Sequence, residues 1–180
     1  MNQSELETWL VAARIDTSNW GHNNAKTVAD LAREVANGES TLHVDPPRRV
    51  VQVVQVSLWR DERVLIEVEQ EFGDGRKRER GHVPSEKMLP NEDPIGAALR
   101  CLKEELGLDA DQLLGSPRYI NSSKKMRDSP SYPGLLSQFT MHQVLVETMA
   151  LPDENFSTKN EAHAEGDPIA VSHWAWQHPS

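Results

Sequence analysis

The sequence has a single cysteine, Cys101, among its 180 residues, so the chain cannot form a disulfide bond with itself. No stretch approaches the roughly 18 consecutive apolar residues of a membrane-spanning helix, and we expect no membrane contact. The first residues lack a basic segment followed by an apolar run, so we expect no signal peptide. These absences favour a cytoplasmic protein.

Basic residues are also scarce: 19 Lys and Arg stand against 28 Asp and Glu, which gives a net charge of -9. Tight binding to a nucleic acid duplex needs a basic surface, so that class of partner is disfavoured. The Gly-rich signatures of P-loop and dinucleotide-binding proteins are absent. The seven His residues do not show the His-x3-His spacing of a zinc site.

The N-terminal part of the sequence predicts helices. Residues 4–15 form one candidate, with Ser4 as N-cap and Glu7 at the capping-box position, and residues 25–37 form another, which Gly38 ends. We expect residues 1–45 to be a helical extension and residues 46–180 to be the main domain.

The extension holds more apolar side chains than two short helices can bury alone. They are Leu6, Trp9, Leu10, Val28, Leu31 and Val35. We expect them to pack either on the sheet of the same chain or, with a slight preference, across a homodimer.

Beyond residue 45 the apolar pattern changes to a period of two, which predicts β-strands. The expected strands are residues 51–59, 64–68, 119–120, 138–149 and 170–177, with turns at 60–62 and 73–75. One clear helix, 94–106, has Pro94 in its first turn and Gly107 just past its end. Helices combined with a mixed, largely antiparallel sheet predict the α+β or α/β class.

The predicted helix 94–106 carries two carboxylates side by side. Ile95, Ala98, Leu99, Leu102 and Leu106 form an apolar stripe that should face the core. We expect Cys101, Glu104 and Glu105 to share the opposite face. Paired carboxylates suit a hard cation such as Mg²⁺, although an acidic helix face is more often simply solvated.

The spacing around these carboxylates resembles a known motif. Residues 83–108 read VPSEKMLPNEDPIGAALRCLKEELGL, which is similar to the Nudix box, Gly-x5-Glu-x7-Arg-Glu-U-x-Glu-Glu-x-Gly-U, where U is a bulky aliphatic residue. Without gaps, the box at 86–108 aligns Glu92, Arg100, Leu102, Glu104, Glu105, Gly107 and Leu108 with the pattern. The resemblance implies a Nudix-type α/β/α sandwich with a mixed sheet.

It also implies a function, namely metal-dependent hydrolysis of a diphosphate-containing small molecule such as a nucleoside diphosphate derivative. Glu104 and Glu105 would hold Mg²⁺ or Mn²⁺ and, with Cys101, form the catalytic set. Arg100 and Glu92 would orient the box carboxylates, and Gly107 would be structural.

Three departures from the box weaken this implication. Cys101 replaces a Glu that usually supplies a metal ligand, and a thiol is a poor ligand for Mg²⁺. Ser85 and Glu86 replace glycines, which implies a differently shaped loop. The extra downstream acid is not identifiable by spacing; the candidates are Glu147, Glu154, Glu161 and Glu165. The alternatives are therefore a degenerate Nudix domain that binds a ligand or protein without turnover, or an isomerase or cyclase on the same fold.

Several cations and one tyrosine are candidates for substrate binding. Arg76, Arg78 and Arg80 follow a turn that leads toward the box, and Lys87 fits the segment that often precedes it. Each charge is as readily explained by a solvated strand edge. Lys124, Lys125 and Arg127 lie in an expected flexible loop, followed by Tyr132, which stacks on a ring of the substrate or anchors the loop as a buried residue.

Overall fold

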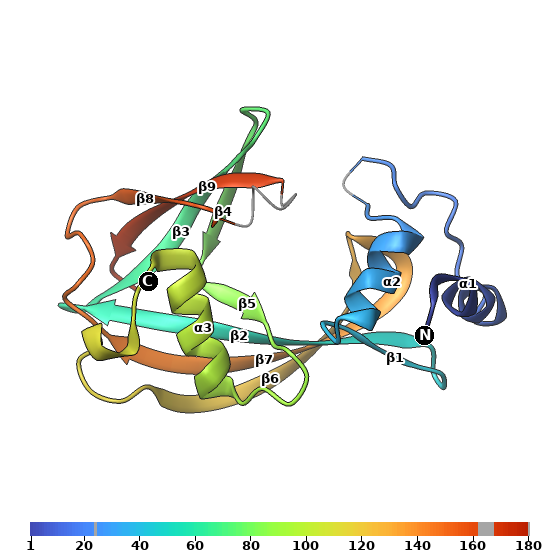
Figure 1. Ribbon diagram of the computed structural model, residues 1–180, viewed down its shortest axis with the longest axis horizontal. Coiled ribbons are helices and arrows are strands. Elements are labelled where there is room, and N and C mark those ends of the chain that lie inside the picture. Colours follow the sequence, from blue (N-terminus) through green and yellow to red (C-terminus); the bar gives the residue numbers. More distant parts are fainter. Residues whose placement is uncertain (24, 162–167, 180) are drawn as a thin grey trace. The chain divides into compact units, whose positions relative to one another are not determined.

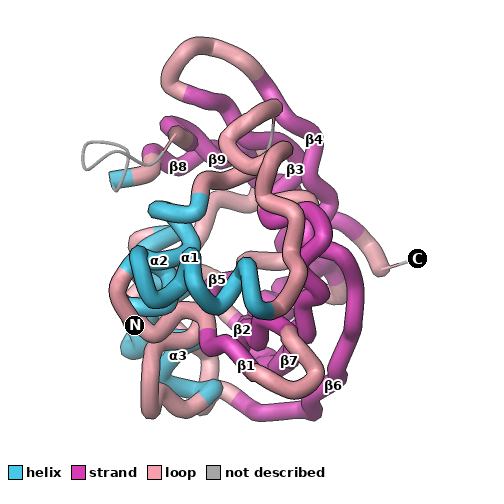
Figure 2. Tube along the Cα trace, turned by 90° about the vertical axis from the view of Figure 1, so that its right-hand side faces the viewer, coloured by secondary structure: helices cyan, strands magenta, loops and turns pink. Residues whose placement is uncertain are grey.

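The computed structural model describes all residues except 24, 162–167 and 180 (Figure 1). The chain forms two compact units. Unit 1 comprises Met1–Val53, Lys87–Glu92 and Ser122–Met141, and unit 2 comprises Val54–Glu86, Asp93–Asn121 and His142–Ser180. Strands dominate the described chain, as the colouring by secondary structure shows (Figure 2).

The strands form a sheet whose order is β6-β7-β2-β3-β9-β8, with β1 and β5 paired to β2 and β4 paired to β3. Their bounds are β1 Thr41–His43, β2 Arg48–Arg60, β3 Arg63–Phe72, β4 Lys77–His82, β5 Ser85–Lys87, β6 Arg118–Ser129, β7 Tyr132–Glu147, β8 Phe156–Lys159 and β9 Ile169–Gln177. The helices are α1 Gln3–Ala12, α2 Val28–Ala36, α3 Pro94–Leu106 and the short 3₁₀ helix η1 Ala110–Gln112.

In unit 2 the predicted hairpin is confirmed. β2 and β3 pair antiparallel through Trp59 with Val64, and the two turn residues between them both have positive φ, as a tight hairpin turn requires. β7 ends beside the end of β2, because Thr148 N donates to Trp59 O at 3.2 Å. The two strands therefore run in the same direction, and the sheet is mixed. The α/β class with a mixed sheet and N-terminal helices is confirmed.

Helix α3 has the bounds that the sequence predicts. Asp93 caps it by accepting from the backbone N–H of Ile95 at 2.9 Å, and Gly107 ends it with a left-handed φ of 66°. Its buried residues are Ala97, Ala98, Cys101, Leu102 and Leu106. In the described part of unit 2, α3 is the one α-helix available to cover the sheet.

The expected place of Cys101 on the face opposite the apolar stripe is wrong, since the residue is 0% exposed and belongs to the buried side of the helix. The helix buries two neighbouring rows, one through Ala97 and Cys101 and one through Ala98 and Leu102. The apolar stripe is wider than the one expected, because the small residues Ala97 and Cys101 let that side approach its neighbours closely.

In unit 1 the helices start elsewhere than expected. The N-cap of α1 is Asn2, which forms its capping box with Glu5 instead of the expected Ser4 and Glu7. The N-cap of α2 is Thr27, which forms a box with Asp30. Asn and Thr cap as well as Ser does, so the sequence alone does not choose between neighbouring caps.

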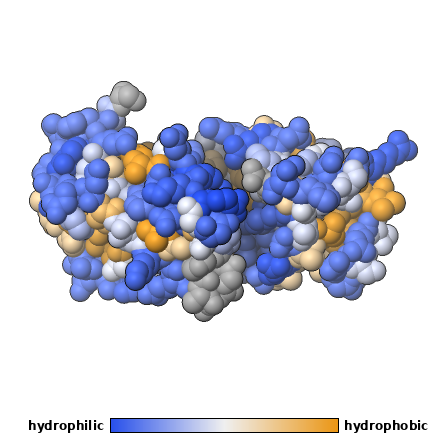
Figure 3. All heavy atoms as spheres, turned by 90° about the horizontal axis from the view of Figure 1, so that it is seen from above, coloured by the Kyte–Doolittle hydropathy of each residue, from blue (hydrophilic) through white to orange (hydrophobic). Residues whose placement is uncertain are grey.

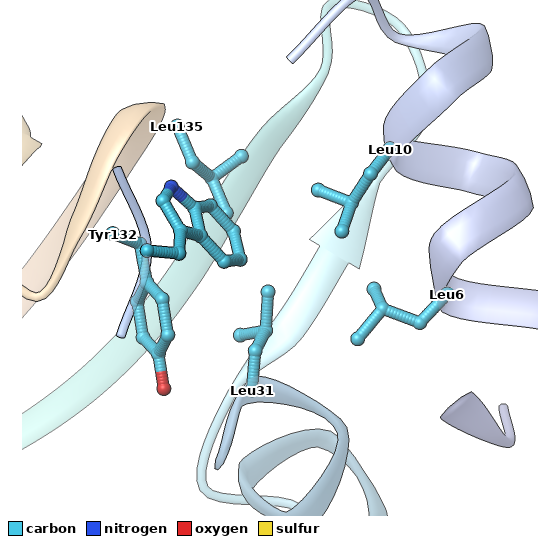
Figure 4. Close-up of a cluster of buried hydrophobic side chains, with 6 residues drawn as sticks. Leu6, Leu10, Leu31, Tyr132 and Leu135 are labelled. Atoms are coloured by element: carbon cyan, nitrogen blue, oxygen red, sulfur yellow. The ribbon is translucent and has the colours of Figure 1, made fainter. Parts of the chain in front are cut away.

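The apolar residues of the two helices are buried within the same chain. Leu6 and Leu10 of α1, Leu31 of α2 and Tyr132 and Leu135 of β7 form one core cluster together with Trp20 (Figure 4). Trp20 also donates from Nε1 to the carbonyl of Pro133 at 2.9 Å. The helices therefore bury their apolar side chains without a second copy, and a homodimer stays a prediction.

Residues 122–129 and 132–135 are strand, where a flexible loop was expected. β6 and β7 form consecutive strands that meet near residue 130. β6 is exposed on both faces up to Asp128. Because neither face is buried, apolar and polar residues do not alternate along the strand. That absence of period two explains why the sequence pattern reveals the strand only at residues 119–120.

A buried ion cluster links the parts of unit 1. The Glu34 carboxylate, on α2, accepts from Arg49 Nη2 of β2 at 2.6 Å and from Lys26 Nζ at 2.8 Å, and Lys87 Nζ lies 3.0 Å away. Arg49 is 3% exposed and its guanidinium stacks over the Tyr132 ring, 5.0 Å from the centroid. Burial opposes the charge on Glu34, but the three cations outweigh it and hold the pKa of this carboxyl well below its usual value.

Removing this carboxylate should destabilise unit 1. We expect Glu34→Gln to lower the free energy of unfolding by about 3–5 kcal/mol, because Arg49 would be left buried without its anion. Since the pKa of Glu34 is depressed in the folded state, its contribution is present in full at neutral pH and is lost progressively below about pH 4.5. Urea unfolding at several pH values checks both points, with the exposed Glu7→Gln as control. An equal effect of the two substitutions at pH 7 would contradict the role of the cluster.

Candidate functional site

A cleft of about 900 Å³ in unit 2 lies between the C-terminal end of α3 and strands β8 and β9. We call it the α3 cleft. Its charged and polar lining residues are Lys103, Glu104, Glu105, Thr158, Lys159, Asn160 and Glu161. The two box carboxylates therefore share one concave surface with lysines and a third carboxylate.

The four candidate downstream acids differ in whether they line the α3 cleft. Glu161 lines it together with Glu104 and Glu105. Glu147 lines a different cavity, beside the β2–β3 turn, and Glu154 is an exposed residue before β8. Glu165 lies outside the described residues. Proximity in space thus favours Glu161, which sequence spacing does not distinguish from the others.

The carboxylate of Glu104 pairs with an arginine of its own helix. Arg100 Nη1 donates to Glu104 Oε2 at 3.1 Å, an i,i+4 pair whose glutamate side chain is 52% exposed. Glu92, the expected partner of Arg100, accepts from the backbone N–H of Leu89 at 2.9 Å. Glu92 thereby helps to fix the turn that leads into α3.

The Cys101 thiol is unsuited to the chemistry of a ligand or nucleophile. Burial raises the pKa of this thiol well above its usual value, and the nearby carboxylates of Glu105 and Glu86 raise it further. A thiol that stays protonated binds hard cations poorly and attacks poorly. The box position that usually provides a third carboxylate therefore provides none.

Glu86 is the residue that sequence reasoning missed. Glu86 was expected only to change the shape of the loop. Its carboxylate in fact lies close enough to Cys101 to raise the pKa of the thiol. β5, which carries it, is held against β2 by the hydrogen bond from Val56 N to Pro84 O at 2.8 Å. The sequence carries a signal for Glu86: relative to the box pattern, position 101 lacks the usual Glu and position 86 has a Glu in place of Gly.

The α3 cleft offers a divalent cation two or three carboxylates that do not form a closed set of ligands. Within the described ranges, no three side chains of His, Cys, Asp or Glu gather closely enough to hold a metal. Glu104 and Glu105 nevertheless provide hard oxygen donors in a cleft that also holds Glu161. Mg²⁺ typically takes one or two carboxylates plus substrate phosphates and water. The residues fit a cation that binds with a phosphorylated ligand better than one held by the protein alone.

The three arginines in and just before β4 are paired with neighbouring side chains. Arg76 lies 2.8 Å from Asp74, Arg80 lies 3.1 Å from Glu67, and Arg78 donates to Gln70. Arg80 also lines a second cavity, of about 630 Å³, with Glu69, Glu79 and His173. The structure brings none of these three arginines into the lining of the α3 cleft.

Two further candidates lie in unit 1. Lys87 is engaged by Glu34 and by Glu39, the latter at 3.1 Å. Tyr132 is 0% exposed, and its ring packs against Trp20 with centroids 5.1 Å apart. In this structure both residues belong to the packing of unit 1.

No protein-family model matches the sequence, and no curated protein matches it. Similar solved structures include a Nudix hydrolase from Nitrosomonas europaea, with 15% identity over 70% of each chain and a TM-score of 0.41. The dihydroneopterin triphosphate pyrophosphohydrolase of E. coli shows 19% identity over 72% of this chain and 80% of that one, with a TM-score of 0.41. The E. coli ORF135 protein shows 18% identity and a TM-score of 0.34; the match covers 53% of this chain and 60% of that protein. The activities in these names belong to those proteins.

None of the helices in the described residues is long and apolar enough to cross a bilayer. Hydrophilic side chains cover most of the face drawn in Figure 3, with apolar patches between them.

The burial of Cys101 predicts an unreactive thiol. At pH 8 we expect a disulfide reagent such as dithionitrobenzoate to modify the native protein at least about 100-fold more slowly than the same protein in guanidinium chloride, because the folded state both hides the sulfur and disfavours the thiolate. The absorbance of the released thiolate measures both rates. Equal rates would show that Cys101 is accessible and would contradict the burial.

Proposed function

We propose that this chain is a Nudix-type hydrolase that cleaves a diphosphate-containing small molecule with Mg²⁺ or Mn²⁺. The observation that carries the proposal is the α3 cleft, in which Glu104 and Glu105, aligned with the box, meet Glu161 and two lysines. Residues 46–180 would form the catalytic domain, and residues 1–45 its helical extension.

The carboxylates of the cleft would hold the cation. Glu105 and Glu104 supply oxygen donors, and the phosphates of the substrate complete the set. When bound, the cation would neutralise charge on the phosphoryl oxygens and acidify an attacking water.

The other residues of the cleft have separate roles. Lys103 and Lys159 would attract the diphosphate as point charges. Glu161 would accept a proton from the attacking water, since a carboxylate in such a cleft can act as a general base. Arg100 would orient Glu104 through the pair that already exists, and Glu92 and Gly107 would shape the ends of the loop and helix.

A second candidate function is a binding module without turnover. It is favoured by the buried, protonated Cys101 in place of a carboxylate and by the engagement of Glu104 with Arg100. The cleft would then hold a diphosphate ligand without positioning a water. An isomerase or cyclase that uses Cys101 is disfavoured, because the thiol is both buried and protonated.

Neutral substitutions of the cleft acids test the proposal. We expect Glu105→Gln and Glu161→Gln each to lower kcat/KM on a panel of nucleotide sugars and dinucleoside polyphosphates by about 100-fold or more, because each removes charge that acts on the transition state. Release of phosphate or nucleotide at millimolar Mg²⁺ is the measurement.

Glu154→Gln and Glu147→Gln are the matched controls, since both change a candidate acid outside the cleft, and they should retain activity. Hydrolysis that survives Glu105→Gln would contradict the proposal. Wild-type protein that binds a panel member but never cleaves it would favour the binding module.

Cys101→Glu probes the missing carboxylate. The new side chain would be buried beside Glu105 and Glu86, so the variant should melt at a lower temperature than the wild type without metal. Mn²⁺ should raise its melting temperature more than that of the wild type, because a third carboxylate tightens the site. Cys101→Ser, which adds no charge, is the control. An equal response of both variants to Mn²⁺ would place the cation away from this position.

A further inference from the structure

Strand β6 ends the sheet. In the described part of the chain it pairs with β7 alone, so its other edge faces no strand. The half that belongs to unit 1, Ser122–Ser129, has the sequence SSKKMRDS. An edge strand presents free N–H and C=O groups that can pair with another extended chain.

This segment is also uncovered on its faces. Every residue from Ser122 to Asp128 is exposed, whichever side of the sheet its side chain takes. Met126 is 49% exposed. Sheets usually pack at least one face, so a strand that is bare on two faces and one edge is an available surface.

The charge of the segment is opposite to that of the protein. Lys124, Lys125 and Arg127 oppose Asp128 alone, whereas the whole chain carries -9. Among the described residues, neither Lys124 nor Lys125 forms an ion pair, in contrast to Lys26, Lys77, Lys87 and Lys103. Arg127 stacks over the Phe139 ring of β7 at 4.7 Å.

We propose that Ser122–Ser129 of β6 binds an acidic, extended segment of a partner protein, which adds to the sheet as a further strand. Main-chain hydrogen bonds along the edge provide affinity, and alternate side chains provide selectivity. Lys124 and Lys125 are consecutive in β6 and lie on opposite faces. Carboxylates on one face of the added strand therefore lie opposite one of the two lysines, and cross-strand pairs of opposite charge stabilise such an arrangement.

A second copy of this chain is the less suitable partner. Two β6 edges would bring the lysines of both copies together, and like charges directly opposite each other are destabilising. Lysines at an edge commonly prevent such self-pairing. The same residues do not prevent pairing with an acidic strand. A nucleic acid is also unsuitable, because the rest of the protein is acidic and repels a polyanion.

Fluorescence anisotropy with the full chain tests this proposal. The probe is a labelled, acetylated eight-residue peptide of alternating Glu and Val. We expect it to bind with an affinity in the micromolar range, and the double variant Lys124→Glu/Lys125→Glu to bind it at least about tenfold more weakly. The control is Arg14→Glu/Arg76→Glu, which changes the net charge equally at exposed positions outside β6 and should bind as the wild type does.

A second peptide separates strand addition from simple charge attraction. It has the same side chains but an N-methyl group on every backbone amide, so neither of its edges can donate to the ladder. We expect its affinity to fall at least about tenfold. Equal binding of both peptides, equal loss in both double variants, or no binding of the acidic peptide would overturn the proposal. So would a β6-dependent dimer in sedimentation, or tighter binding of a single-stranded oligonucleotide in competition.

Discussion

The burial of α3 along two rows is the constraint on which the candidate site depends. Ala97 and Cys101 lie in one row and Ala98 and Leu102 in the other, and all four are almost fully buried. With the helix fixed in this way, Glu104 and Glu105 both line the cleft with β8 and β9. The same packing that positions the two carboxylates also removes Cys101 from solvent. The packing of α3 thus explains both why two carboxylates line the cleft and why the side chain at position 101 does not reach it.

Two groups of carboxylates show how environment decides role. Glu34 is 5% exposed and its charge is satisfied by Arg49, Lys26 and Lys87. Its pairing is complete, so it stabilises unit 1 and leaves no capacity for a ligand. Glu104 is half exposed and has one i,i+4 partner, which is a weak interaction. A cation or a phosphate-bound cation can therefore compete for it.

Local signals made α3 predictable. Asp93, Pro94 and Gly107 mark its ends, and the apolar spacing marks its length. The hairpin of β2 and β3 followed equally from local alternation. The start of α1 did not, because Asn2 and Ser4 are both good caps. Only residues 119–120 of β6 were predicted as strand, because a strand exposed on both faces has no apolar period. Glu161 and Glu86 were not assigned because their roles depend on which distant segments meet α3, and no spacing along the chain encodes that.

The central claim is that the α3 cleft takes a cation together with a diphosphate. Crystals grown with Mn²⁺, with and without methylenediphosphonate, test it most directly through the anomalous signal of the metal. The account predicts a strong peak at the carboxylates of Glu104 and Glu105 when the diphosphonate is bound, and a weak peak or none without it. A diphosphonate bound in the cleft with no metal beside these carboxylates, or bound only elsewhere on the protein, would contradict the account.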